Sequence, residues 1–154
     1  MRWIVLIVVA VLLALWQHTQ LAWWSWAPQL GVALTAWAVV DGDDGSVPVR
    51  AFVVGACWDL VDPGSDCFHA AVLTGLAIVV WPLRAVLLRT HPLGWGGVAA
   101  VLSLAVSGID AALGGVGDLT FGMAAMRALM TALAAVLLGW LFSGLPGRWR
   151  PVAP

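Results

Sequence analysis

Three ionisable side chains stand inside long apolar segments of this sequence: Asp59, Asp110 and Arg127. A charge placed well inside a bilayer costs about 3 kcal/mol or more, so such residues are expected to have partners. Side chains of these types either bind a substrate or relay protons, or they hold helices together as ion pairs. The topology derived below places all three at a similar depth. We therefore expect one ion-paired cluster in which Arg127 bridges the two acids.

We favour the structural role for this cluster over the functional one. Both aspartates fall near the ends of their segments, where a side chain can reach water and lose part of the energetic penalty. A proton-driven pump would more naturally hold an acid at mid-span, and none is found there. On this interpretation the cluster pins the segments 48–61, 93–113 and 122–143 together.

A second polar stretch separates two apolar segments, and it contains four side chains of types that bind zinc: Asp62, Asp66, Cys67 and His69. The paired Cys-x-x-Cys or His-x-x-x-His spacing of zinc sites is missing, so we expect no metal centre. The stretch instead predicts a bent connection. Pro63 blocks continuation of one helix, and Ser65 or Asp66 caps the next.

The sequence contains no catalytic motif. A nucleophile elbow, a phosphate-binding loop and a zincin helix are all missing from it. Cys57 and Cys67 are the only cysteines, and we interpret them as a small core residue and an incidental thiol. We therefore predict that the protein is not an enzyme and needs no cofactor.

The amino-acid composition is that of a membrane protein. Of 154 residues, 62% are hydrophobic and only 10% are charged, and the mean hydropathy is +0.99. A soluble domain of this length needs a much more polar surface. The net charge of −1 provides no basic patch for nucleic acid. The sequence predicts one all-α domain, residues 1–154, embedded in a lipid bilayer.

Apolar runs predict a compact bundle of about six transmembrane helices. A spanning helix needs about 20 mostly apolar residues, and it must be helical to satisfy its backbone. The segments are 3–20, 23–40, 48–61, 68–88, 93–113 and 122–143. The third is short, so it either crosses a thin region or is partly re-entrant. The first has no convincing cleavage site after it, and we interpret it as a retained helix.

Arginine positions orient the bundle, because positively charged residues gather on the cytoplasmic side. Six crossings with both termini inside place all arginines except Arg127 on that side: Arg2, Arg50, Arg84, Arg89, Arg148 and Arg150. A four-span arrangement, in which the second and third segments do not cross, moves only Arg50 and stays open. The eleven Trp, Trp37 and Trp58 among them, then fall near segment ends, as expected for interfacial anchors.

Small and polar residues repeat at helical spacing on three of the segments. Ala51, Gly55 and Asp59 are four residues apart, which makes a small face where another helix can approach closely. A second small face comprises Ala124, Ala128 and Ala132. One stripe on the fifth segment comprises Ser103, Ser107, Asp110 and Gly114. We expect all three stripes to face other helices.

Residues 28–40 and 50–76, together with the fifth segment ending in Ser-Gly-Ile-Asp-Ala-Ala-Leu, resemble the family of rod shape-determining MreD proteins. The similarity is carried by a Pro at the start of the second helix and by a small-residue helix ending in Gly-x-x-x-Asp-Leu. Pro28, Gly55, Asp59 and Leu60 supply this pattern, and a Gly-containing turn follows it. The chain is also similar to that family in length and in its short loops.

The resemblance implies a non-enzymatic, multi-pass scaffold of the bacterial cytoplasmic membrane. Its partners would be an MreC-like protein and other components of the peptidoglycan elongation machinery. The small faces around Ala51 and Gly55 and on the sixth segment would dock a partner's transmembrane helix, while Asp59 would fix the helices that build the docking surface. A second similarity of layout, to the substrate-binding subunits of energy-coupling-factor transporters, implies a vitamin-sized ligand and an anion pocket built on Arg127.

Overall fold

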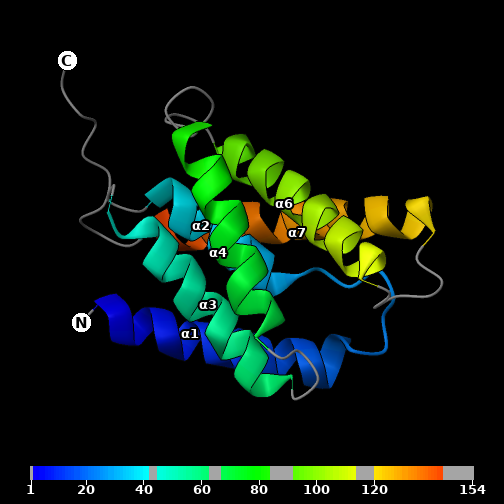
Figure 1. Cartoon of the computed structure of the whole chain (residues 1–154), viewed down its shortest axis with the longest axis horizontal. Helices are drawn as coiled ribbons and strands as arrows, with labels where there is room; N and C mark the ends of the chain where they lie inside the picture. The colour runs from blue at the N-terminus through cyan, green and yellow to red at the C-terminus, as the bar shows by residue number, and fades with distance from the viewer. Residues whose placement is uncertain (1, 42–44, 63–66, 84–91, 114–119, 144–154) are drawn as a thin grey trace.

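The structure is a computed structural model that describes residues 2–41, 45–62, 67–83, 92–113 and 120–143. Within these ranges the chain is helical and contains no strand, which confirms the predicted all-α class (Figure 1). The elements in chain order are α1 (Arg2–Trp16) with the π-helical turn η1 (Gln17–Leu21), α2 (Leu30–Asp41), α3 (Val47–Val61), α4 (Phe68–Val80) with the 3₁₀ turn η2 (Trp81–Leu83), α6 (Pro92–Ala112) and α7 (Phe121–Ser143).

Three of the described helical stretches are long and apolar enough to cross a bilayer: Trp3–Leu21, Gly94–Ala112 and Phe121–Leu141. A stretch of 19 residues extends about 28 Å at 1.5 Å per residue, close to the thickness of the hydrocarbon core. Two further apolar helices, Leu30–Val40 and Phe68–Val80, are shorter.

The second helix begins later than the sequence predicts. The predicted segment starts at residue 23, whereas α2 starts at Leu30 after a non-helical stretch. Pro28 accounts for this difference, because a proline disfavours helical geometry at the residue before it. With 12 residues, α2 extends only about 18 Å. The fourth predicted segment, 68–88, is regular α-helix only as far as Val80, and its residues 84–88 lie outside the described ranges.

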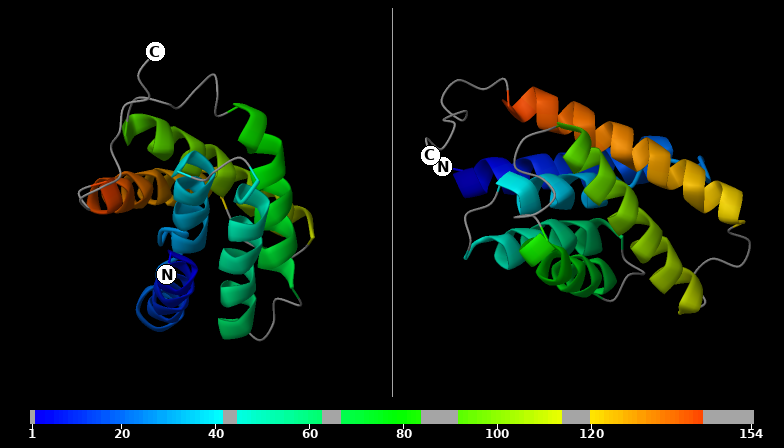
Figure 2. Two further views of the ribbon diagram at one scale, coloured as in Figure 1. Left: turned by 90° about the vertical axis from the view of Figure 1, so that its left-hand side faces the viewer. Right: turned by 90° about the horizontal axis from the view of Figure 1, so that it is seen from above.

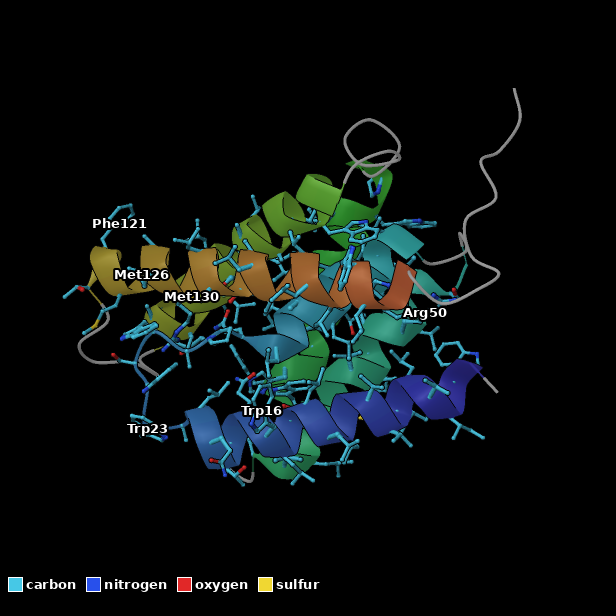
Figure 3. All side chains as sticks on the ribbon, turned by 180° about the vertical axis from the view of Figure 1, so that it is seen from behind. Trp16, Trp23, Arg50, Phe121, Met126 and Met130 are labelled. Atoms are coloured by element: carbon cyan, nitrogen blue, oxygen red, sulfur yellow. The ribbon has the colours of Figure 1, made fainter. Side chains whose placement is uncertain are left out.

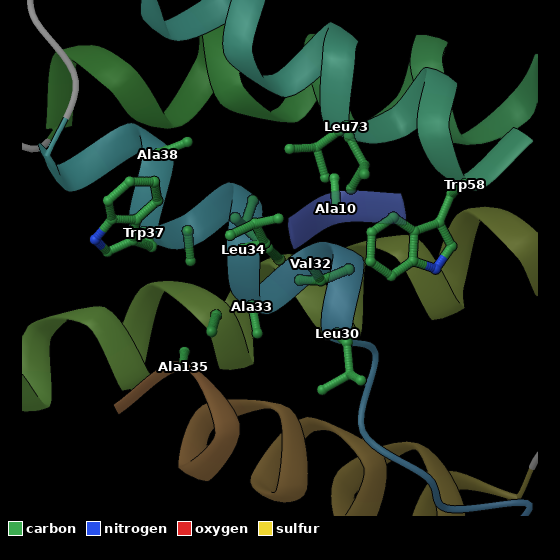
Figure 4. Close-up of a cluster of buried hydrophobic side chains, with 14 of the residues drawn as sticks. Ala10, Leu30, Val32, Ala33, Leu34, Trp37, Ala38, Trp58, Leu73 and Ala135 are labelled. Atoms are coloured by element: carbon green, nitrogen blue, oxygen red, sulfur yellow. The ribbon is translucent and has the colours of Figure 1, made fainter. Parts of the chain in front are cut away.

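The short helix α2 occupies the centre of the bundle. Every residue from Leu30 to Val39 is buried, and α2 packs against α1, α3, α4, α6 and α7 (Figure 2). Figure 4 shows its side chains meeting Ala10 of α1, Leu73 of α4 and Ala135 of α7. A helix that is apolar on all sides is stable only when neighbours surround it. The other helices therefore form two antiparallel pairs, α3–α4 and α6–α7, with α1 alongside, around this central element.

Trp37 and Trp58 are core residues, so their prediction as interfacial anchors is wrong. Trp58 is only 2% exposed, and its indole covers Gly31 of α2, where an added Cβ would lie 2.9 Å from the ring. The glycine lets the indole rest directly on the backbone of α2. Burying so large an apolar ring at a helix crossing outweighs leaving it at the interface. By contrast, Trp23 and Trp140 are exposed, as expected of anchors.

Candidate functional site

Asp59, at the end of α3, caps the N-terminus of α4. Its side chain is 8% exposed. One carboxylate oxygen accepts a hydrogen bond from the backbone N–H of His69 at 2.9 Å, and the other accepts one from Ala70 at 2.8 Å. The first four N–H groups of a helix have no partner within it. Asp59 therefore satisfies two of these groups from a different helix. Its negative charge also interacts favourably with the positive N-terminal end of the α4 dipole.

The local sequence of α4 explains why the cap comes from another helix. Cys67 occupies the position where a capping side chain normally sits, but it makes no such bond and has a left-handed φ of 64°. The predicted caps, Ser65 and Asp66, lie outside the described residues. Asp59 also meets the imidazole of His69, whose Nδ1 lies 3.0 Å from the same carboxylate oxygen that accepts its backbone N–H.

Gly55, one helical turn before Asp59, brings the backbones of α3 and α4 into direct contact. A Cβ built at Gly55 would lie 2.5 Å from both the Cα of Ala70 and the carbonyl oxygen of His69. Ala51, one turn further back, is fully buried in a small cluster with Val39 of α2 and Ala77 of α4. The predicted close approach is therefore present, and it serves helices of the same chain.

Arg127 has a different partner from the one that the sequence predicts. Its Nη2 donates a hydrogen bond of 2.7 Å to the backbone carbonyl of Ser25, in the non-helical stretch before α2. Asp110 on α6 is near enough to act on the guanidinium electrostatically. Among the described residues, however, no carboxylate makes an ion pair with it. Asp59 is bonded to α4 instead.

The expectation of one cluster in which Arg127 bridges Asp59 and Asp110 is therefore wrong. The structure brings Asp110 and Arg127 near each other and places Asp59 in the α3–α4 hairpin. Two unsatisfied N–H groups at a helix start offer a carboxylate two directed hydrogen bonds. An exposed carbonyl in a broken segment likewise needs a donor, and Arg127 supplies it.

A polar network that sequence reasoning missed holds the N-terminus of α2. Gln17 of η1 accepts a hydrogen bond from the N–H of Leu30 at 2.8 Å, and Thr131 of α7 accepts one from the N–H of Gln29 at 2.9 Å. Ser103 of α6 donates to the side-chain oxygen of Gln29 at 2.7 Å. Three separate helices thus compensate for the broken start of α2, where unpaired amides would otherwise be buried.

The polar stripe on α6 faces inward, as predicted. Ser103 and Ser107 are buried, and Asp110 is half-buried. Gly114, the fourth member, lies outside the described residues. Ala128 on α7 is also buried, and Ala132 is near Gly96 of α6. These small and polar faces therefore take part in packing within the chain.

Replacing Thr131 with valine tests the network. The substitution removes the acceptor for the N–H of Gln29, so we expect the free energy of unfolding to fall by about 1–3 kcal/mol. Thr74→Val is the matched control, because among the described residues the hydroxyl of Thr74 bonds only to the carbonyl one turn back, at Ala70. Equilibrium unfolding of both variants in detergent micelles measures the difference. Equal losses would show that Thr131 contributes nothing through Gln29.

The described residues contain no group of three or more side chains able to hold a metal ion. Cys67 is exposed and Cys57 is buried, and neither forms a disulfide. Asp66, one of the four sequence candidates for zinc, lies outside the described ranges. The clearest site is therefore the α3–α4 hairpin, in which Gly55 and Asp59 fix how the two helices meet.

Comparisons of the chain with family models, with curated proteins and with solved structures found no match. What the protein does must therefore be inferred from its own residues and their geometry.

Proposed function

We propose that the protein is a non-enzymatic, multi-pass subunit of the bacterial cytoplasmic membrane that docks transmembrane helices of the cell-wall elongation machinery, including that of an MreC-like protein. The observation that carries the proposal is the position of the Gly-x-x-x-Asp-Leu residues where α3 meets α4. Gly55 and Asp59 hold α3 and α4 together, and Leu60 beside them is 83% exposed. Gly55 and Asp59 thereby set the position of α3 against α4, and the exposed side of α3, which includes Leu60, is the surface of the proposed scaffold.

In this proposal the chain crosses the membrane six times with both termini on the cytoplasmic side. The distribution of arginines supports this orientation. Although α2 is too short to span the hydrocarbon by itself, it is enclosed by the other helices. Irregular backbone at membrane depth is tolerated where protein surrounds it, as it is before α2.

The docking surface in this proposal is the outward face of α3. From the sequence, the faces around Ala51 and Gly55 were expected to dock a partner. In the structure they pack against α2 and α4, so a partner helix cannot reach them. On the outward side of α3, Val49, Phe52 and Leu60 are exposed. Their spacing of three and eight residues makes one continuous stripe along the helix. Such a stripe suits an apolar partner helix that lies alongside.

Photo-crosslinking tests this surface. A photoreactive amino acid replaces Phe52 or Leu60 in the full-length protein expressed in cells. We expect crosslinks to a single-pass, MreC-like protein from both positions. Val101 is an equally apolar, exposed position on α6, and we expect it to give no such product. Crosslinks of equal yield from all three positions, or none from α3 in cells of normal shape, would contradict the proposal.

A further inference from the structure

An apolar groove lies beside the first turns of α7. It has a volume of about 370 Å³, is open on one side, and is lined by Trp26, Thr120, Gly122, Met123, Met126 and Met130. Figure 3 shows Met126 and Met130 on this part of α7. Methionine side chains are flexible and polarizable, so they adapt to the shape of an apolar guest. In a bilayer such a groove suits a hydrocarbon chain.

A cation borders this groove. Arg127 follows Met126 directly on α7 and lies between Met123 and Met130, which are four residues before it and three after it. The guanidinium is held by the carbonyl of Ser25, the residue immediately before Trp26. This bond ties the guanidinium to the backbone beside Trp26, a residue that lines the groove.

The guanidinium retains donors for a ligand. Arginine has five N–H donors, and within the described residues Arg127 uses Nη2 on Ser25 and makes no ion pair. Asp110 on α6 favours the charged guanidinium electrostatically, and it forms no ion pair with Arg127. A planar guanidinium with free N–H groups matches the oxygens of a phosphate.

We propose that this groove binds one anionic phospholipid, with an acyl chain against the methionines and its phosphate on Arg127. Two features together select this occupant. A soluble anion would make no apolar contacts with the lining. A lipid without net charge would not neutralise the guanidinium. Arg127 is six residues beyond the start of α7 at Phe121, about 9 Å along the helix axis. An arginine at that depth extends its charged end towards the headgroups.

Native mass spectrometry of the detergent-purified, full-length protein tests the proposal. The protein is titrated with phosphatidylglycerol and, separately, with phosphatidylcholine carrying the same acyl chains. We expect one retained phosphatidylglycerol per chain, with about tenfold preference over phosphatidylcholine. Arg127→Gln should lower the retention of phosphatidylglycerol to that of phosphatidylcholine. Arg127→Lys should give an intermediate value, since lysine keeps the charge but cannot bind a phosphate through two parallel N–H groups.

Two further variants separate a specific site from lipid that merely surrounds the protein. Arg50 lies at the opposite end of the bundle from Phe121 (Figure 3), 5.9 Å from the ring centroid of Trp3. Arg50→Gln should leave the retention of phosphatidylglycerol unchanged. Met130→Trp fills the groove without changing charge and should reduce the retention of both lipids about tenfold. Circular dichroism checks that each variant is folded.

Three outcomes would overturn the proposal. The first is equal retention of the two lipids by the unmodified protein. The second is an equal loss of phosphatidylglycerol from Arg127→Gln and Arg50→Gln. The third is displacement of phosphatidylglycerol by inorganic phosphate at the same concentration, since that would show that the acyl chain contributes nothing. If Arg127→Gln fails to fold, unchanged lipid retention by Met130→Trp would overturn the proposal independently.

Discussion

Gly55→Ala is expected to lower the free energy of unfolding by about 3 kcal/mol, the upper end of what an added methyl group costs in a packed interior. The new Cβ would lie 2.5 Å from the Cα of Ala70 and from the carbonyl oxygen of His69. Both atoms belong to the backbone of α4, so no side-chain rotation relieves the contact. The helices must separate, and separation also lengthens the bonds that Asp59 makes to α4. Equilibrium unfolding in detergent micelles measures the loss.

Gly75→Ala is the matched control for this substitution. Gly75 is also in the α3–α4 hairpin, within α4, but a Cβ there would have no atom within 4 Å. Alanine is a better helix former than glycine by about 0.5–1 kcal/mol, so we expect the control to be unchanged or slightly more stable. If both alanine variants unfold alike, the close approach of α3 and α4 at Gly55 does not contribute to stability.

Gly55→Ala and a polar substitution at Phe52 together separate an effect on folding from an effect on partner binding. Gly55 is inside the chain's own helix pair, whereas Phe52 and Leu60 face outward from α3. A loss of crosslinks in Gly55→Ala therefore reports a distorted hairpin. A loss caused by a polar substitution at Phe52, with unchanged stability, would report the docking surface itself.

The long helices were accessible from the sequence because they follow uninterrupted apolar runs. The predicted segments 93–113 and 122–143 agree closely with α6 and α7. The second segment was harder, because the Trp-rich stretch before Pro28 also consists mostly of apolar residues and contains no charge. Hydropathy cannot separate an apolar helix from an apolar connection. Pro28 contained the boundary signal, since it disfavours helical geometry at the residue before it.

The importance of Asp59 was accessible from the sequence, but its partner was not. An apolar environment around a carboxylate predicts that something satisfies it. The N–H groups that do so belong to residues ten and eleven positions later, and only the packing of α4 against α3 brings them to Asp59. Local capping patterns direct attention to the residues beside a helix start, here Ser65 and Asp66.

The small face around Gly55 shows a related limit. Spacing by four predicts that another helix approaches closely, but it does not say whether that helix belongs to the same chain. Gln17, Gln29 and Thr131 were missed for a different reason. They come from three separate segments and form a network only after the chain has folded. A glutamine next to a proline-broken helix start is the one local signal that points to such a network.

Asp59→Ala is expected to lower the free energy of unfolding by about 2–4 kcal/mol. It removes two hydrogen bonds from backbone N–H groups to a charged acceptor, each worth about 1.5–3 kcal/mol when made. Water that reaches the freed N–H groups of α4 offsets a part of this loss in stability. Because the carboxylate is 8% exposed, the donors left behind are poorly placed to reach water. Unfolding in micelles measures the stability, and amide exchange at His69 and Ala70 reports the cap directly.

Asp59→Asn and His69→Ala identify which of these contacts matters. The amide of asparagine offers one acceptor oxygen, and its NH₂ group then faces the second backbone donor, so we expect about half of the alanine loss. His69→Ala retains its backbone N–H bond to Asp59 and removes only an imidazole that is 26% exposed. We therefore expect it to cost less than about 1 kcal/mol, as for a partly exposed pair. A larger loss for His69→Ala than for Asp59→Asn would contradict the capping role and would show that the carboxylate acts mainly through the imidazole.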